Sequence, residues 1–300
     1  MDDDIARDAN DIRHNDQAAR WNGAAGQAWV DARPMLDQLF EPLQDLLIRT
    51  IPAGAGDGGR YSVLDVGCGT GGTTRAAARR IGATRPDDSG CTGVDVSAPM
   101  IEAARRHAEQ AGLPVRFVLA DAQTHDLGTG RFDLIMSRFG VMFFADPVAA
   151  FRNVRGAARQ GGQLRFIAWR SAADNPFMTT AETAAAPLLP DLPSRHTALP
   201  GQANLPGQFA FADPDRVRRI LSDSGWAAVG LEAIDVVCSM PASALTGYIS
   251  RLGPVGLALS GADDATRTRI VKAIRPAFDP FVSGDMVRFT AACWLATAVA

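Results

Sequence analysis

The sequence predicts an α/β protein built on a doubly wound, mostly parallel sheet. Short apolar segments alternate with amphipathic segments of helical period from residue 61 onward, which is the pattern of such sheets. A turn rich in glycine joins the first expected strand to the first helix, and an aspartate stands in or at the end of each of the first three expected strands. Together these observations favour a sheet with a ligand site at the carboxyl ends of its strands.

Apolar runs bounded by turn residues predict the strands of the first half of the sheet. YSVLDVG (61–67) is an apolar strand, and the helix after it runs through TTRAAARRI (73–81). A helix after the second strand has Ser97 as its N-cap, Pro99 in its first turn and Gly112 at its end. The strands that we expect in the complete sheet are 61–67, 91–97, 115–121, 132–138, 162–170, 229–240 and 287–299.

Three regions follow from these elements. We expect an N-terminal helical lid and packing segment at 1–60, a core at 61–170, and edge strands with two helical insertions at 171–300. An amphipathic helix at 147–159 precedes the fifth strand, and a capped helix at 213–226 precedes the sixth. The last two strands should form a hairpin at one edge of the sheet. The insertions are expected at 171–212, which holds six of the eighteen prolines, and at 243–283.

Composition excludes several classes of function. The net charge is −3 and the arginines are spread along the chain, so no basic surface for nucleic acid is expected. The four cysteines lie far apart and lack zinc-ligand spacing, which indicates reduced thiols and no metal site. No apolar run is long enough for a membrane span, and the aspartate-rich start does not resemble a signal peptide. We therefore expect a cytoplasmic protein without a membrane partner. The sequence does not determine the oligomeric state and leaves a homodimer open.

The segment VLDVGCGTGG (63–72) fits two ligand patterns. Gly67, Gly69 and Gly72 match the dinucleotide pattern GxGxxG, whereas Gly67, Gly69 and Gly71 match GxGxG. Asp65, two residues before the first glycine, would repel a pyrophosphate and attract a cation. The α-ammonium of S-adenosylmethionine is such a cation, and glycines let the backbone approach it closely. A tight turn without a ligand is the structural alternative.

Two further acids complete the pattern. Asp95 ends the second strand and offers two carboxylate oxygens to a ribose diol, and Asp121 ends the third strand in LADAQ, where it can accept from an adenine amino group. Either residue could instead be structural, as a buried or a solvated acid. Because all three acids belong to neighbouring strands on the ligand-binding edge, their joint placement is more specific than the glycine motif.

With these residues the chain resembles class I S-adenosylmethionine-dependent methyltransferases, and in particular the bacterial small-molecule group. The resemblance covers about residues 60–170 closely, through the stretches VLDVGCGTG (63–71), GVDVSAPMI (93–101), LADAQ (119–123), FDLIMSRFGVMFF (132–144) and GGQLRFIAW (161–169). It implies a seven-stranded sheet with one antiparallel strand and S-adenosyl-L-methionine as cofactor. The cofactor-binding residues that it implies are Asp65, Gly67, Gly69, Gly71, Asp95, Val96, Met100, Asp121, Ala122 and Ser137.

The acceptor is less constrained. After the fourth strand the chain continues as SRFG instead of the motif that nucleobase amine methylation uses, so a DNA adenine enzyme is not expected. Phe139 and Phe143 in RFGVMFF (138–144) could line an apolar acceptor pocket or pack in the core. Trp21 and Trp29 lie eight residues apart, on one helical face, and belong either to an anchored helix or to a lid over the cofactor.

No general base follows from the sequence. His125, four residues after Asp121, is the weak candidate, and methyl transfer can proceed by positioning and exclusion of water alone. The expected function is methyl transfer to O or C of a small, apolar or aromatic molecule. A catalytically idle S-adenosylmethionine-binding subunit and a nicotinamide-dependent oxidoreductase are the alternatives.

Overall fold

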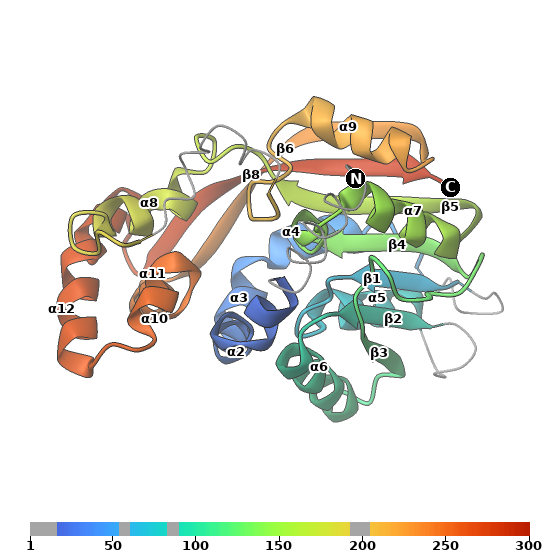
Figure 1. Cartoon of the computed structure of the whole chain (residues 1–300). Helices are drawn as coiled ribbons and strands as arrows, with labels where there is room; N and C mark the ends of the chain where they lie inside the picture. The colour runs from blue at the N-terminus through green and yellow to red at the C-terminus, as the bar shows by residue number, and fades with distance from the viewer. Residues whose placement is uncertain (1–16, 54–60, 83–89, 193–204) are drawn as a thin grey trace, which may run out of the picture.

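A single mostly parallel sheet forms the centre of the molecule in the computed structural model, which describes residues 17–53, 61–82, 90–192 and 205–300 (Figure 1). The predicted N-terminal segment 1–60 and the insertion 171–212 therefore lie partly outside the described residues. The sheet order is β3-β2-β1-β4-β5-β8-β6, and β7 pairs with β8. The strands are β1 (Val63–Val66), β2 (Cys91–Asp95), β3 (Val115–Leu119), β4 (Phe132–Arg138), β5 (Ala158–Trp169), β6 (Ala227–Pro241), β7 (Val282–Ser283) and β8 (Met286–Val299).

The predicted topology is confirmed. β1 pairs in parallel with both β2 and β4, while β8 runs antiparallel to β5 and β6 and forms the predicted edge hairpin with β6. The prediction of seven strands omitted β7, because a two-residue strand before a glycine turn leaves no alternating pattern in a sequence. β5 also begins earlier than expected, since Ala158 already pairs with Phe132 across an irregularity in the β4–β5 register.

Helices cover both faces of the sheet. Alternation along β1 sends Val63 into one cluster with Ala77 and Ile81 of α5 (Gly72–Ile81), and Leu64 into the other, which contains Phe151 of α7 (Pro147–Ala157). The other helices of the core are α2 (Ala24–Asp31), α3 (Arg33–Leu39), α4 (Glu41–Ile48), α6 (Ala98–Gln110), η1 (Val141–Phe143) and α9 (Pro214–Asp223).

β6 and β8 extend well beyond the rest of the sheet. β5 pairs only with the part of β8 from Cys293 to Val299, whereas the pairing of β6 with β8 continues to Pro241 and Met286. The extended part carries a second helical lobe, seen at the left of Figure 1. This lobe consists of α8 (Pro176–Ala185), η2 (Ala242–Ala244), α10 (Leu245–Arg251), α11 (Gly253–Leu259), α12 (Asp264–Ile274) and η3 (Arg275–Phe281).

The two predicted insertions thus meet in one lobe with an aromatic core. Phe177 of α8 stacks on Phe289 of β8 with ring centroids 4.0 Å apart, and it packs edge-on against Phe278 and Phe281 of η3. The lobe joins α8 to helices that begin more than 50 residues later in the chain. The sequence predicted both insertions but not their association.

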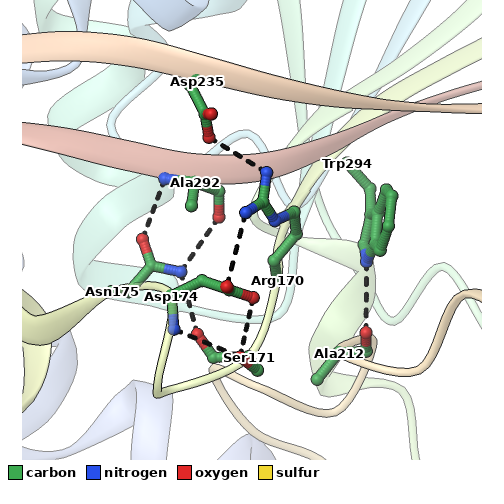
Figure 2. A network of polar contacts seen from close by, with 8 residues as sticks. All are labelled: Arg170, Ser171, Asp174, Asn175, Ala212, Asp235, Ala292 and Trp294. Atoms are coloured by element: carbon green, nitrogen blue, oxygen red, sulfur yellow. Dashed lines mark hydrogen bonds and ion pairs between the residues drawn. The ribbon is translucent and has the colours of Figure 1, made fainter.

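A polar network fixes the place where α8 leaves the sheet (Figure 2). The buried Asn175 side chain donates to the backbone oxygen of Ala292 and accepts from its nitrogen, both at 2.9 Å, so it pairs with β8 as another strand would. Arg170 donates to Asp235 of β6 at 2.9 Å and lies 3.4 Å from Asp174. Bonds to Ser171 and to Arg170 hold the pKa of Asp174 below its usual value. These contacts orient the second lobe relative to the ends of the core strands.

None of the described helices has the length and apolar character needed to cross a membrane.

Candidate active site

The glycine turn after β1 has a different constraint at each glycine. Gly67, Gly69 and Gly71 all have positive φ, at 66°, 54° and 76°. A Cβ on Gly67 would lie 2.5 Å from the Cα of Gly140, so this glycine is required by the close approach of two backbones. At Gly69 the nearest atom to such a Cβ is the sulfur of Met100, at 3.7 Å. Gly69 therefore has open space around it, in the direction in which a ligand can approach.

Asp65 is buried within β1. Its side chain is 1% exposed and accepts a hydrogen bond of 2.7 Å from the Thr74 hydroxyl. Burial raises the pKa of Asp65 to about 7, while the bond from Thr74 and the positive charge of Arg138 act in the opposite direction. Asp65 therefore titrates near neutral pH, and its charge responds to any cation placed nearby.

Asp95 ends β2 and Asp121 lies two residues after the neighbouring strand β3, and both acids organise the loops there. Asp95 accepts from the backbone nitrogen of Gly69 at 2.8 Å and from that of Ser97 at 2.9 Å. Burial raises the pKa of Asp95, and these backbone bonds oppose the rise. Asp121 accepts from the nitrogen of Gln123 at 2.7 Å. Because each carboxylate oxygen has two lone pairs, Asp95 can still accept hydrogen bonds from a ligand.

One cavity of about 240 Å³ lies at this edge of the sheet. Seven of the ten predicted cofactor-binding residues line it, and these are Gly67, Gly69, Asp95, Val96, Met100, Asp121 and Ala122. Asp65, Gly71 and Ser137 do not. Ser137 is buried and accepts from the nitrogen of Gly140, while a Cβ on Gly71 would meet the ring of Phe117 at 2.6 Å. His125 also lies outside the lining.

The other end of the cavity is aromatic. Phe139 stacks on Trp169 with ring centroids 4.5 Å apart and planes 3° apart, and Phe40 packs edge-on against both. Phe139 has a φ of 65°, a conformation that a bulky residue adopts only where its surroundings hold it. The predicted residues Trp21, Trp29, Phe139 and Phe143 all line this cavity. Within the described residues, no group of three or more His, Cys, Asp or Glu is arranged to hold a metal ion.

Comparison with known proteins finds a match for the segment that contains the glycine turn, Asp95 and Asp121. The family described as "Methyltransferase domain" matches residues 63–162. An aklanonic acid methyltransferase of Streptomyces sp. (strain C5) is 35% identical over 106 residues, which cover 35% of this chain and 46% of that protein. A ubiquinone biosynthesis O-methyltransferase of Methylobacterium sp. (strain 4-46) is 30% identical over 155 residues, covering 49% and 59%.

Residues 63–162 are the part of the chain that matches a methyltransferase domain, and they are called the methyltransferase domain below. The chain spans about half the length of the curated relatives that it matches. Two solved structures share the fold. The YcgJ protein of Bacillus subtilis superposes with a TM-score of 0.54 at 18% identity, covering 85% of this chain and 97% of its own. The [4+2]-cyclase SpnF superposes with a TM-score of 0.51 at 18% identity, covering 91% and 94%.

The N-terminal segment covers the methyltransferase domain at the loop between β2 and α6. Trp21 lies 6.1 Å from Trp29 and 5.1 Å from Phe143, ring to ring, in edge-on contacts. The Asn22 side chain donates to the oxygen of Val96 at 2.9 Å and accepts from the nitrogen of Ala98 at 2.8 Å. The two tryptophans thus belong to one aromatic cluster, and the segment that carries them is attached directly to the loop that follows Asp95.

The second lobe supplies wall residues that the sequence did not indicate. Met178, Ala181 and Glu182 of α8 line the cavity, as do Tyr248 and Arg251 of α10. They reach the methyltransferase domain because β6 and β8 carry their helices beyond the core. No spacing or motif marks these positions, and only the meeting of the two insertions brings them together.

Proposed function

We propose that the protein is an S-adenosylmethionine-dependent methyltransferase that acts on O or C of a small apolar or aromatic molecule. The observation that carries the proposal is a single cavity with two chemically different ends. Its polar end is formed by the glycine turn and the acids after β2 and β3, and its far end by stacked aromatic rings. A nucleoside fits the first end and a flat apolar acceptor fits the second.

The polar end offers matching groups for adenosine. Asp95 would accept from the ribose hydroxyls, with its orientation fixed by the nitrogens of Gly69 and Ser97. Asp121 and Ala122 would hold the adenine edge, and Val96 and Met100 its face. Asp65 would act on the methionine ammonium as a nearby buried charge, since it does not line the cavity itself.

S-adenosylmethionine supplies an electrophilic methyl group when it is bound. The chain then has to hold the acceptor in line with that group and keep water out, because positioning supplies much of the rate of such a displacement. Phe40, Phe139 and Trp169 form the wall that would position the acceptor. Trp21 and Trp29 would exclude water on the N-terminal side. The proposal requires no general base for an acceptor that is already ionised.

We also propose that the acceptor is a small molecule rather than a nucleic acid and that the enzyme works in the cytoplasm. The net charge of −3 and four buried cysteines without disulfide partners support these two points. For the alternative of an idle binding subunit, we would expect a large uncovered apolar surface. The exposed large hydrophobic residues are instead scattered among the described ranges, at Leu119, Leu188, Leu205 and Val237.

Calorimetric titration with S-adenosylhomocysteine and with NADH tests the proposal. We expect saturable binding of S-adenosylhomocysteine and none of NADH. Binding of NADH alone would support the oxidoreductase alternative. Binding of S-adenosylhomocysteine without methyl transfer to any molecule that copurifies with the protein would support the idle subunit.

A further inference from the structure

We propose that Arg138 selects an acceptor that carries an anionic oxygen group, a carboxylate or an ionised phenol, beside its aromatic part. This inference rests on the proposed function and concerns the acceptor end of the same cavity. Arg138 is the last residue of β4 and lines the cavity next to the stacked pair of Phe139 and Trp169.

The guanidinium of Arg138 has few partners in the protein. One nitrogen donates to the backbone oxygen of Phe40 at 3.2 Å, and the group lies 5.9 Å from the centre of the Phe40 ring. Within the described residues, no carboxylate lies within 4 Å of it. An arginine has five N–H donors, so most of the donors of Arg138 remain available to a ligand.

Its surroundings make an unpaired charge costly. Burial lowers the pKa of Arg138, and the nearby charges of Asp37 and Asp65 oppose this only from a distance. The wall around it is aromatic, and a charged group held in such a place without a partner costs free energy. A ligand oxygen that carries negative charge would supply the partner, and a guanidinium binds a carboxylate through two parallel hydrogen bonds.

The position of Arg138 in the sheet favours the acceptor over the nucleoside. Asp95 ends β2 and Asp121 lies two residues after β3, whereas Arg138 ends β4, on the other side of β1. With strands about 4.8 Å apart, the end of β4 lies roughly 14 Å from that of β3. The groups that act on Arg138 come from elements other than β2 and β3, since Phe40 follows α3, Asp37 belongs to α3, Asp65 to β1 and Cys238 to β6.

Other charged groups at this end do not neutralise Arg138. Arg251 of α10 lines the same wall, and within the described residues no carboxylate lies within 4 Å of its guanidinium either. Glu182 of α8 is the acid of this wall, at 5% exposure. Apart from the two acids of the polar end, the charged residues that line the cavity are Arg20, Arg138, Arg251 and Glu182, an excess of positive charge that suits an anionic ligand.

Matched pairs of aromatic acids and their amides test the inference, because each pair differs in charge but hardly in shape. Benzoate and benzamide, 2-naphthoate and 2-naphthamide, and anthracene-2-carboxylate and its amide span one to three rings. Each compound is titrated into the protein saturated with S-adenosylhomocysteine, and binding is followed by the fluorescence of the cavity tryptophans. We expect at least one acid to bind tenfold or more tightly than its amide.

Variants assign this preference to Arg138. Arg138→Gln should abolish the difference between acid and amide, and Arg138→Lys should retain part of it. Arg116→Gln is the control, because Arg116 is an exposed arginine on β3 outside the cavity lining. Thermal unfolding checks that the variants are folded, and binding of S-adenosylhomocysteine to Arg138→Gln should be unchanged.

Three results would overturn the inference. The first is that no acid binds more tightly than its amide. The second is that the preference for acids survives in Arg138→Gln. The third is that Arg138→Gln weakens S-adenosylhomocysteine instead, which would make the methionine carboxylate the partner of this arginine. If the unmodified protein does not bind S-adenosylhomocysteine, the proposed function itself is refuted. Failure of the proposed function is therefore distinguishable from failure of the inference about Arg138.

Discussion

The two ends of the cavity differ in how their residues come together. The polar end is assembled from loops that follow β1, β2 and β3, within about 60 residues of chain. Backbone hydrogen bonds to Asp95 hold the loops after β1 and β2, and a backbone bond to Asp121 holds the loop after β3. The aromatic end collects side chains from α3, β4, β5, α8 and α10, which span more than 200 residues. Local rules of turn geometry determine the first, and long-range packing determines the second.

This difference has a functional consequence. A site held by backbone geometry tolerates little change and suits a ligand that is always the same. A site made of side chains on separate elements can change shape by substitution while the sheet stays intact. We therefore expect substitutions at the polar end to affect the fold or the cofactor, and substitutions at the aromatic end to affect the acceptor alone.

The largest expected effect separates two glycines of the polar end. Gly67→Ala places a Cβ 2.5 Å from the Cα of Gly140, where two backbones cannot move apart easily. Together with its positive φ, this should reduce the free energy of unfolding by about 2–5 kcal/mol. Gly69→Ala has no such contact and should cost only about 1–2 kcal/mol, but should weaken S-adenosylhomocysteine strongly.

Urea unfolding and calorimetry on both variants measure the two effects. Equal losses of stability in Gly67→Ala and Gly69→Ala would mean that the approach of the two backbones is not what requires Gly67.

Asp95→Ala should have the next largest effect. It removes the acceptor for the ribose and also frees the nitrogens of Gly69 and Ser97. The expected loss in binding of S-adenosylhomocysteine is about 2–4 kcal/mol, since each charge-assisted hydrogen bond contributes about 1.5–3 kcal/mol. An unchanged dissociation constant in a folded variant would place the ribose elsewhere, and circular dichroism provides the control for folding.

The sequence predicts features of the polar end of the cavity better than features of the aromatic end. Glycines with positive φ and acids at strand ends leave local patterns, so Gly69, Asp95 and Asp121 could be placed at one edge of the sheet, and the edge hairpin of β6 and β8 could be predicted. Phe40 lies in the predicted lid and packing segment 1–60, but it could not be assigned to the acceptor wall, because its partners Phe139 and Trp169 lie about 100 residues away or more. Asn175 and Glu182 lie in a segment whose path depends on long-range contacts with β8 and with the helices of the second lobe, which no local pattern encodes.

A change of pH should distinguish Asp65 from the exposed acids. Its native pKa of about 7 lies above the ordinary value of 3.8, so between about pH 4 and pH 7 the native state holds a proton that the unfolded state releases. Stability should therefore fall as pH rises through this window and level off above pH 7. From pH 5 to pH 8, deprotonation of Asp65 should lower the free energy of unfolding by about 2–3 kcal/mol.

Asp65→Asn should reduce this slope and make the protein more stable than the unmodified chain at pH 8. It should also weaken S-adenosylhomocysteine, because the ammonium loses its nearby charge. Urea unfolding at both pH values measures the slope. If the slope persists unchanged in Asp65→Asn, another group is responsible for it.

The smallest expected effect concerns the N-terminal cover. Asn22→Ala removes two hydrogen bonds to the loop after Asp95. Because these bonds are exposed, we expect a loss of about 1 kcal/mol in binding of S-adenosylhomocysteine and a smaller change in tryptophan fluorescence on binding. Gln27→Ala is the matched control, since the bond from Gln27 to Asp31 stays within the same helix. If the two variants bind S-adenosylhomocysteine equally well and show the same fluorescence change, Trp21 and Trp29 only anchor a helix and do not cover the cofactor.

The position of S-adenosylhomocysteine in a co-crystal tests the central claim most directly. We expect the ribose on Asp95, the adenine beside Asp121 and Ala122, and the sulfur directed toward Phe139 and Trp169, with the aromatic end left open for the acceptor. Adenine stacked within the cluster of Phe40, Phe139 and Trp169, or a ligand bound outside this cavity, would contradict it.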